Sequence, residues 1–252
     1  MAVMDEFKEE RALIKGQPFK KRFEYYWGYY KWHVFAVACV AIFITSYVYN
    51  IVTAKEDALT VALIDCNSDE ATIDEYKNEL MELMELNPKT HDITLDNSFF
   101  LSSADTMAYS IAEVFYVKIA AGDIDVVLAP EDTFNRYVQN DIFVDIRDFL
   151  SPEQIEFYQD SFYYVDYAVI ESEDIYETDF AETEFVDNAN HRSPENMEKP
   201  IPVGIYVTGT EEFQGKYYFQ RASQEVVFGI VGFVEDGTYA LQFLDNMTGR
   251  VE

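Results

Sequence analysis

The chain has 252 residues, of which 49% are hydrophobic, 26% charged and 16% aromatic. It carries 47 Asp and Glu against 18 Lys and Arg, a formal net charge of −29. This acidic excess argues against nucleic acid as a partner, because phosphate binding needs a basic surface. The aromatic content is typical of a folded chain. The two cysteines, Cys39 and Cys66, are too few for a disulfide framework.

Charge divides the chain into three regions. Residues 1–31 hold seven Lys and Arg and five acidic residues, residues 32–54 hold no charged residue, and residues 55–252 hold 11 basic and 42 acidic residues. As a helix, the uncharged segment would span about 35 Å at about 1.5 Å per residue, enough to cross the hydrocarbon core of a bilayer. The sequence therefore predicts one transmembrane helix over residues 32–54.

Aromatic and basic residues around this segment predict how it sits in the membrane. Tyr and Trp gather at its two ends, as in an aromatic belt: Tyr25, Tyr26, Trp27, Tyr29, Tyr30, Trp32, Tyr47 and Tyr49. Four basic residues lie shortly before it, and Lys55 alone follows closely. The positive-inside rule then predicts a plasma-membrane protein with its N-terminus in the cytoplasm and residues 55–252 outside. Residues 1–31 are interpreted as a cytoplasmic tail whose last turn lies at the interface.

Two processing alternatives remain open for this segment. Residues 52–54, Val-Thr-Ala, resemble a signal-peptidase site, and residues 36–39, Ala-Val-Ala-Cys, loosely resemble a lipobox. The apolar run is longer than the core of a signal peptide and continues beyond Cys39, which favours an uncleaved anchor.

The first part of the outer domain, residues 59–140, predicts strands alternating with helices. Strands are expected at 59–64, 92–96 and 124–128. A helix with a Thr72–Glu75 capping box is expected after the first strand, one capped by Asp105 and ending at Gly122 after the second, and one reaching residue 139 after the third. The apolar helix faces are expected to hold Ile73, Tyr76, Leu80, Leu83, Met84, Met107, Ile111, Val114 and Phe115. This order predicts an α/β domain with parallel neighbouring strands.

The second part has weaker signals. Ser151 and Pro152 open another helix, and residues 171–199 form an acidic stretch interpreted as a loop or excursion. Strands are expected at 201–207 and 225–234, with Gly229 and Gly232 at bends. A final helix is expected to contain Tyr239, Leu241, Phe243, Leu244 and Met247.

Residues 120–130, Ala-Ala-Gly-Asp-Ile-Asp-Val-Val-Leu-Ala-Pro, resemble a stretch of extracellular solute-binding proteins, and the continuation to Leu150 fits as well. The resemblance covers about residues 59–160. The aromatic boundary before a single span also resembles single-pass membrane proteins of clostridial bacteria. The solute-binding family implies two α/β lobes that hold a small molecule and pass it to a permease. The outer part here has only 198 residues, fewer than is usual in that family, which puts a complete second lobe in doubt.

The favoured interpretation is a membrane-tethered, periplasmic-binding-protein-like α/β binding module whose ligand is a small solute and whose partner is a permease or another membrane protein. The alternative is an assembly subunit of a membrane complex without a small ligand. Ligands of open α/β sheets lie beyond the carboxyl ends of the strands. That rule selects Asp65, Asn67, Ser98, Phe99, Glu131, Asp132 and Thr208 as ligand-binding candidates.

Catalytic and cofactor motifs do not support an enzyme. Nucleophilic catalysis needs a base beside a nucleophile, and the outer domain offers only His91 and His191. Residues 209–217 do not match a phosphate-binding loop, and Asp65-x-Asn67-x-Asp69 lacks the glycine and the closing Glu of a calcium loop. No catalytic residue, metal or cofactor is therefore assigned, and Cys66 is interpreted as a buried thiol.

Overall fold

A computed structural model describes residues 18–101, 106–138, 140–172, 190–208, 213, 217, 219 and 225–250. The chain divides into two compact units, Met1–Ala54 and Lys55–Glu252. The expected cap Asp105, residues 1–17 of the tail and residues 173–189 of the acidic stretch lie outside the described residues.

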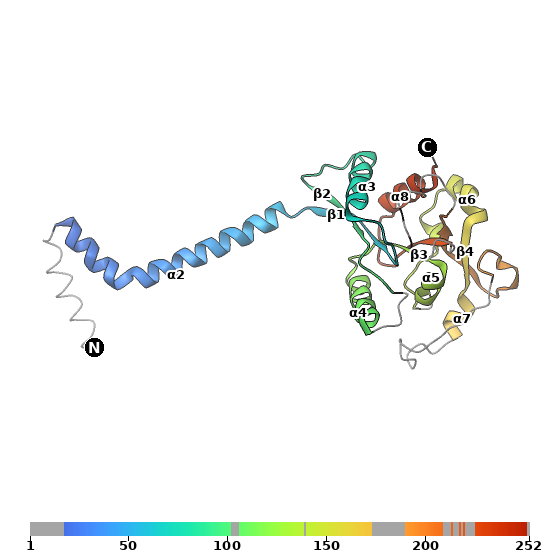
Figure 1. Ribbon diagram of the computed structural model, residues 1–252, viewed down its shortest axis with the longest axis horizontal. Coiled ribbons are helices and arrows are strands. Elements are labelled where there is room, and N and C mark those ends of the chain that lie inside the picture. Colours follow the sequence, from blue (N-terminus) through green and yellow to red (C-terminus); the bar gives the residue numbers. More distant parts are fainter. Residues whose placement is uncertain are drawn as a thin grey trace. The chain divides into compact units, whose positions relative to one another are not determined.

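The first unit contains one long helix, α2 (Phe19–Thr53) (Figure 1). Residues Tyr30–Thr53 are long and apolar enough to cross a membrane, with a mean hydropathy of 2.0. No residue of this apolar window is buried inside the structure. The helix begins well before the expected span, because the residues between Phe19 and Lys31 include no proline. Gly28 weakens the helix but does not interrupt it.

The second unit is an α/β domain built on one six-stranded sheet in the order β2-β1-β3-β6-β5-β4 (Figure 1). The strands are β1 (Glu56–Leu63), β2 (His91–Asp96), β3 (Val126–Pro130), β4 (Phe162–Asp166), β5 (Pro200–Tyr206) and β6 (Val226–Ile230). The helices are α3 (Glu70–Leu83), α4 (Thr106–Ala121), α5 (Glu131–Val138), α6 (Pro152–Tyr158), α7 (Tyr167–Ser172) and α8 (Thr238–Thr248). Short 3-10 turns lie at Ile146–Asp148, Gln159–Ser161 and Pro194–Asn196.

The strand directions confirm the predicted parallel order at the N-terminal side. β1 pairs in parallel with β2 and with β3, whereas β6 and β5 join in antiparallel fashion and β4 closes the far edge. The last 50 residues therefore complete the same sheet. The sequence analysis did not predict β4, because its aromatic run carries no alternation of apolar and polar residues.

Two cores lie on the two faces of the sheet. Helices α3, α6 and α8 cover one face, and α4 and α5 cover the other (Figure 1). Residues at the end of β1 and just after it alternate between them: Val61 and Leu63 enter the first core, and Ala62 and Ile64 enter the second. This period of two is the geometry of a strand buried on both faces.

Several local predictions are confirmed. Ser151 and Gln154 form a reciprocal capping box at the start of α6, with Pro152 at its first position. Gly122 ends the α4 segment with a φ of 74°, a conformation that costs glycine little. The expected helix after β3 is α5, and the final helix is α8.

Other local predictions are wrong. Asp69, and not Thr72, caps α3, because its Oδ1 accepts the Thr72 backbone N–H at 3.0 Å. Leu83 and Val114 are exposed rather than buried, since their helices direct neighbouring residues toward the sheet. Gly229 does not mark a bend. It lies inside β6, where a Cβ atom would come within 2.7 Å of the Phe134 ring.

Candidate functional site

The carboxyl ends of four strands meet at one edge of the sheet. β1, β2, β3 and β5 all run in the same direction, and the antiparallel β4 and β6 begin at that edge. All seven candidate residues follow one of these four strand ends in the chain. The structure therefore places the candidates along one edge, but their side chains have different surroundings.

Asp65 is buried and holds three segments together. Its backbone N–H donates to the Phe99 carbonyl at 2.8 Å. Its Oδ1 accepts from the Leu101 backbone N–H at 2.8 Å, and its Oδ2 accepts from the Thr133 hydroxyl at 3.0 Å. The carboxylate thus joins β1 to the segment after β2 and to α5. Phe99 is buried as well, with its ring centroid 5.3 Å from that of Phe115, so both residues contribute to the interior of the domain.

Ser98, the other candidate after β2, belongs to a carboxylate network. Asp96 Oδ1 accepts from the backbone N–H and the hydroxyl of Ser98, at 3.0 and 2.6 Å. Asp96 Oδ2 accepts from the Lys118 ammonium at 2.8 Å. Burial raises the pKa of Asp96, but the hydrogen bonds from Lys118 and Ser98 outweigh burial and hold the pKa below its ordinary value. Asn67 lies exposed at the same edge.

A cluster of charged and aromatic side chains lies at the ends of β3 and β5. We call Glu131, Arg192, Tyr206 and Glu225 the edge cluster. The Tyr206 hydroxyl donates to Glu131 Oε1 at 2.6 Å, and the Arg192 guanidinium carbon lies 3.8 Å from the centroid of the Tyr206 ring. Arg192 Nε donates to Glu225 Oε2 at 3.2 Å, and its Nη2 pairs with the other oxygen of the same carboxylate. Burial and the bond to Glu131 raise the pKa of Tyr206 far above its ordinary value, so it donates as a neutral phenol.

Exposure within the edge cluster is uneven. Tyr206 is buried, whereas Arg192 and Glu225 are exposed and Glu131 is partly exposed. Stacking on a tyrosine face and pairing with a carboxylate orient the guanidinium. The cluster therefore presents an oriented cation, flanked by carboxylates, at the sheet edge where ligands of α/β folds lie.

Sequence analysis identified only Glu131 of this cluster. Its members are separated by 14 to 61 positions along the chain, and Arg192 belongs to the acidic stretch that was interpreted as a loop. The remaining candidates lie beside it: Asp132 is exposed, and the Thr208 hydroxyl accepts from the Val226 backbone N–H at 3.3 Å. The sequence signal for a site residue is a polar side chain immediately after a predicted strand. Tyr206 does not carry this signal, because it is the last residue of β5 itself.

The connection between β5 and β6 covers the carboxyl end of β1. Its described residues Phe213 and Tyr217 are buried, and Phe219 forms a β-bridge with Cys66. The ring centroid of Tyr217 lies 5.4 Å from that of Tyr76 in α3. Cys66 is fully buried, which confirms its interpretation as an interior thiol.

Within the part of the chain that the structure describes, no group of three His, Cys, Asp or Glu side chains could hold a metal ion. The carboxylates of the calcium-like motif have other partners: Asp65 binds Leu101 and Thr133, and Asp69 caps α3. Comparison with protein-family models, with curated proteins and with solved structures gives no match. The likeness to solute-binding proteins thus stays a prediction from sequence.

Proposed function

We propose that the protein is a membrane-tethered binding module of the plasma membrane, with a cytoplasmic N-terminus and an extracytoplasmic domain at residues 55–252. The apolar helix Tyr30–Thr53 supports the anchor. The four basic residues shortly before it, against Lys55 alone close behind it, support the orientation. Only Ala54 and Lys55 separate α2 from β1.

The edge cluster is the proposed ligand site, and the oriented Arg192 is the observation that carries this proposal. A guanidinium stacked on Tyr206 can bind a carboxylate or hydroxyl of a small polar solute, while Glu131 can accept hydrogen bonds. Such a role resembles one lobe of a solute-binding protein, which would serve a permease. The described residues form a single sheet, so the proposed site is an open edge and not a cleft between two lobes.

A thermal-shift assay on the full chain tests this site. Cys39→Ala leaves Cys66 as the only thiol, and because Cys66 is buried, a thiol-reactive dye would report unfolding of the domain. Sugars, amino acids, peptides and calcium are screened. A ligand at about a hundred times its Kd adds about 2.7 kcal/mol, which corresponds to a rise of about 5–10 °C for a domain of this size.

Matched variants locate the binding. Arg192→Gln should abolish the shift caused by the bound solute. Lys199→Gln should retain it, although Lys199 also pairs with a glutamate, Glu171, and lies 4.7 Å from the ring centroid of a tyrosine, Tyr167. Lys199 precedes β5 and so lies at the opposite edge of the sheet. Equal loss of the shift in both variants would refute the edge cluster as the site.

One observation favours the alternative, an assembly subunit. Helix α4 buries Ala108, Phe115 and Ile119 but leaves Tyr109, Val114 and Val117 half or more exposed. Exposed apolar side chains on one helix provide a surface that a protein partner could cover. In the Cys39→Ala background, Val117→Cys should then cross-link in membranes to a stoichiometric protein, and Lys89→Cys, at an exposed position before β2, provides the control. A stoichiometric product at Val117 together with an empty ligand screen would replace the first proposal by the second.

A further inference from the structure

The first turns of α2 carry a continuous row of aromatic rings. Phe19, Phe23 and Trp27 follow one another at intervals of four residues, and we call them the aromatic ridge. The ring centroids of Phe19 and Phe23 are 6.4 Å apart, and those of Phe23 and Trp27 are 5.7 Å apart, both in stacked orientation. The residues are 83%, 55% and 52% exposed, respectively. A ridge that packs mainly on itself leaves a large apolar surface to be covered by another medium.

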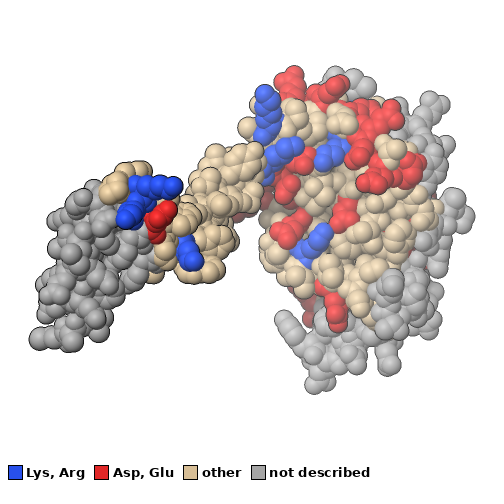
Figure 2. All heavy atoms as spheres, turned by 60° about the vertical axis from the view of Figure 1, so that its left-hand side comes forward, with Lys and Arg blue, Asp and Glu red and all other residues tan. Residues whose placement is uncertain are grey.

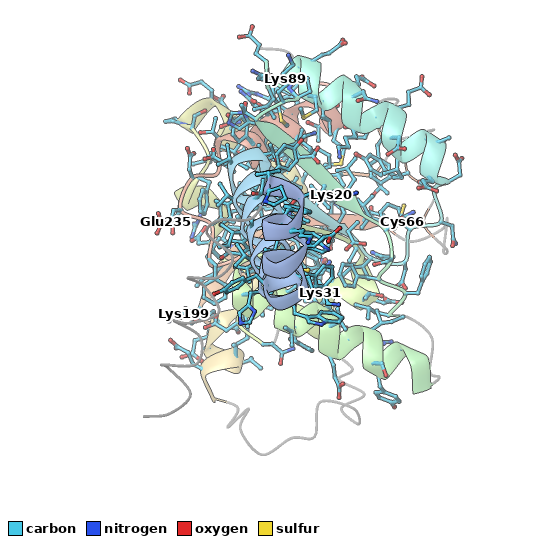
Figure 3. The ribbon with its side chains drawn as sticks, turned by 90° about the vertical axis from the view of Figure 1, so that its left-hand side faces the viewer. Lys20, Lys31, Cys66, Lys89, Lys199 and Glu235 are labelled. Atoms are coloured by element: carbon cyan, nitrogen blue, oxygen red, sulfur yellow. The ribbon has the colours of Figure 1, made fainter. Side chains whose placement is uncertain are left out.

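Basic side chains accompany this ridge. Residues 19–31 include four Lys and Arg, the last of them Lys31, and a single acidic residue, Glu24. Figure 2 shows basic side chains gathered on the first turns of α2, followed by a stretch of the helix without charged side chains. Lys20 and Lys31 (Figure 3) are about three turns of 3.6 residues apart, so both lie on one flank of the ridge.

The ridge is continuous with the apolar segment Tyr30–Thr53 in the same helix. Figure 1 shows that α2 bends between its first turns and the apolar remainder. Gly28 lies between the two parts, and glycine stabilises a helix less than any residue other than proline. A bend at this place allows the first turns to lie along a membrane surface while the remainder crosses the bilayer.

We propose that Phe19–Trp27 lies in the cytoplasmic membrane–water interface, with the aromatic ridge in the bilayer and its lysines on anionic phospholipid headgroups. The proposal rests on the membrane anchor and orientation proposed above. Aromatic rings flanked by lysines are the composition of interfacial helices. Each Lys close to an anionic leaflet strengthens its attraction to that leaflet about five-fold. A second copy of the chain would instead bring like-charged clusters together.

The positions of the tryptophans allow a direct test. The protein has two, Trp27 in the ridge and Trp32 in the apolar segment. Trp32→Phe therefore leaves Trp27 as the only tryptophan, and Trp27→Phe leaves Trp32, so that selective excitation of tryptophan reports one indole at a time. The full chain is reconstituted in phosphatidylcholine vesicles with or without phosphatidylglycerol. Acrylamide then reports exposure to water, and lipids with nitroxide labels at two depths report the position of each indole.

We expect Trp27 to be quenched most strongly by the shallow nitroxide. Its acrylamide quenching should fall about two-fold or more when phosphatidylglycerol is added. Lys20→Gln combined with Lys21→Gln should remove that difference. The matched control Glu24→Gln, which neutralises the acidic residue of the same turns, should preserve or enlarge it.

The possible outcomes distinguish failure of this proposal from failure of the proposed membrane anchor. Trp27 open to acrylamide while Trp32 is shielded would overturn the interfacial site and leave the anchor intact. Both indoles open to acrylamide would overturn the anchor itself. Shielding of Trp27 that is the same with and without phosphatidylglycerol would refute binding to anionic headgroups. Shielding that increases with protein density in the vesicles would assign the ridge to a second copy.

Discussion

Asp65 shows how a residue expected to bind ligand instead stabilises the domain. Its carboxylate accepts hydrogen bonds from the Leu101 backbone and the Thr133 hydroxyl, and it is buried. Removing the carboxylate would leave these two donors without an acceptor, and each unsatisfied buried group costs about 1–3 kcal/mol.

We expect Asp65→Ala to lower the free energy of unfolding by about 3 kcal/mol. Asp65→Asn should cost less, because asparagine keeps one acceptor and tolerates the φ of 57° at this position. Chemical denaturation followed by circular dichroism measures both. The exposed neighbour Asn67→Ala should change stability by no more than about 0.5 kcal/mol. A comparable loss at Asn67 would contradict the role given to the Asp65 carboxylate.

Asp96 makes stability depend on pH. Its pKa is lower in the folded than in the unfolded state, because its hydrogen bonds with Lys118 and Ser98 outweigh its burial. The unfolded state therefore binds more protons, and the contribution of Asp96 is complete above the unfolded pKa of about 3.9. It is lost as the pH falls through the lower, folded-state pKa.

We expect the difference in unfolding free energy between the native chain and Asp96→Asn to be largest above about pH 5 and to shrink on acidification. Denaturation curves at several pH values measure this difference. Protonation of the other acidic residues changes the stability of both proteins alike, so this effect cancels when the two proteins are compared at the same pH. A difference that grows toward low pH would reverse the assigned sign.

At the scale of elements, two strand glycines allow helix α5 to approach the sheet. The Phe134 ring lies over neighbouring strands, where a Cβ at Gly204 or Gly229 would come within 3.2 or 2.7 Å of it. Phe134 also stacks on Phe143 at a centroid distance of 4.3 Å. The close packing of this ring explains why β6 has glycine at a fully buried position.

Gly229→Ala should destabilise the domain by about 1–3 kcal/mol, as expected for overpacking of a core. Gly232→Ala is the matched control, because its Cβ would meet Val144 at 3.5 Å, an ordinary contact. Thermal unfolding of the two variants measures the difference between their midpoints. Similar midpoints would mean that α5 moves freely away from the sheet.

At the scale of the molecule, the α/β domain of residues 55–252 has a hydrophobic core of its own. Both hydrophobic clusters consist of residues from Leu59 to Met247, and none comes from α2. We expect residues 55–252 alone to fold, with an unfolding midpoint within about 2 °C of that of the domain in the full chain. Circular dichroism of the fragment and the thiol-dye assay on the full chain provide the comparison. A fragment without a cooperative transition would show that the helix supports the fold.

The sequence by itself determined the features that depend on neighbouring residues. The uncharged segment, the alternation of β1 to α5 and the capping of α6 each follow from a local pattern of polarity or from one turn of backbone. Even there, the choice between Asp69 and Thr72 as the cap of α3 was wrong, because both residues can cap and only the backbone path selects one.

Tertiary structure alone decided which chain segments meet. β6 separates β3 from β5, and Glu131, Arg192, Tyr206 and Glu225 come together from distant parts of the chain. Local patterns carry no information on such pairings, because these depend on which apolar faces can be buried together. For the same reason, one carboxylate after a strand, Asp65, is buried in the interior, whereas another, Glu131, lies at the open edge.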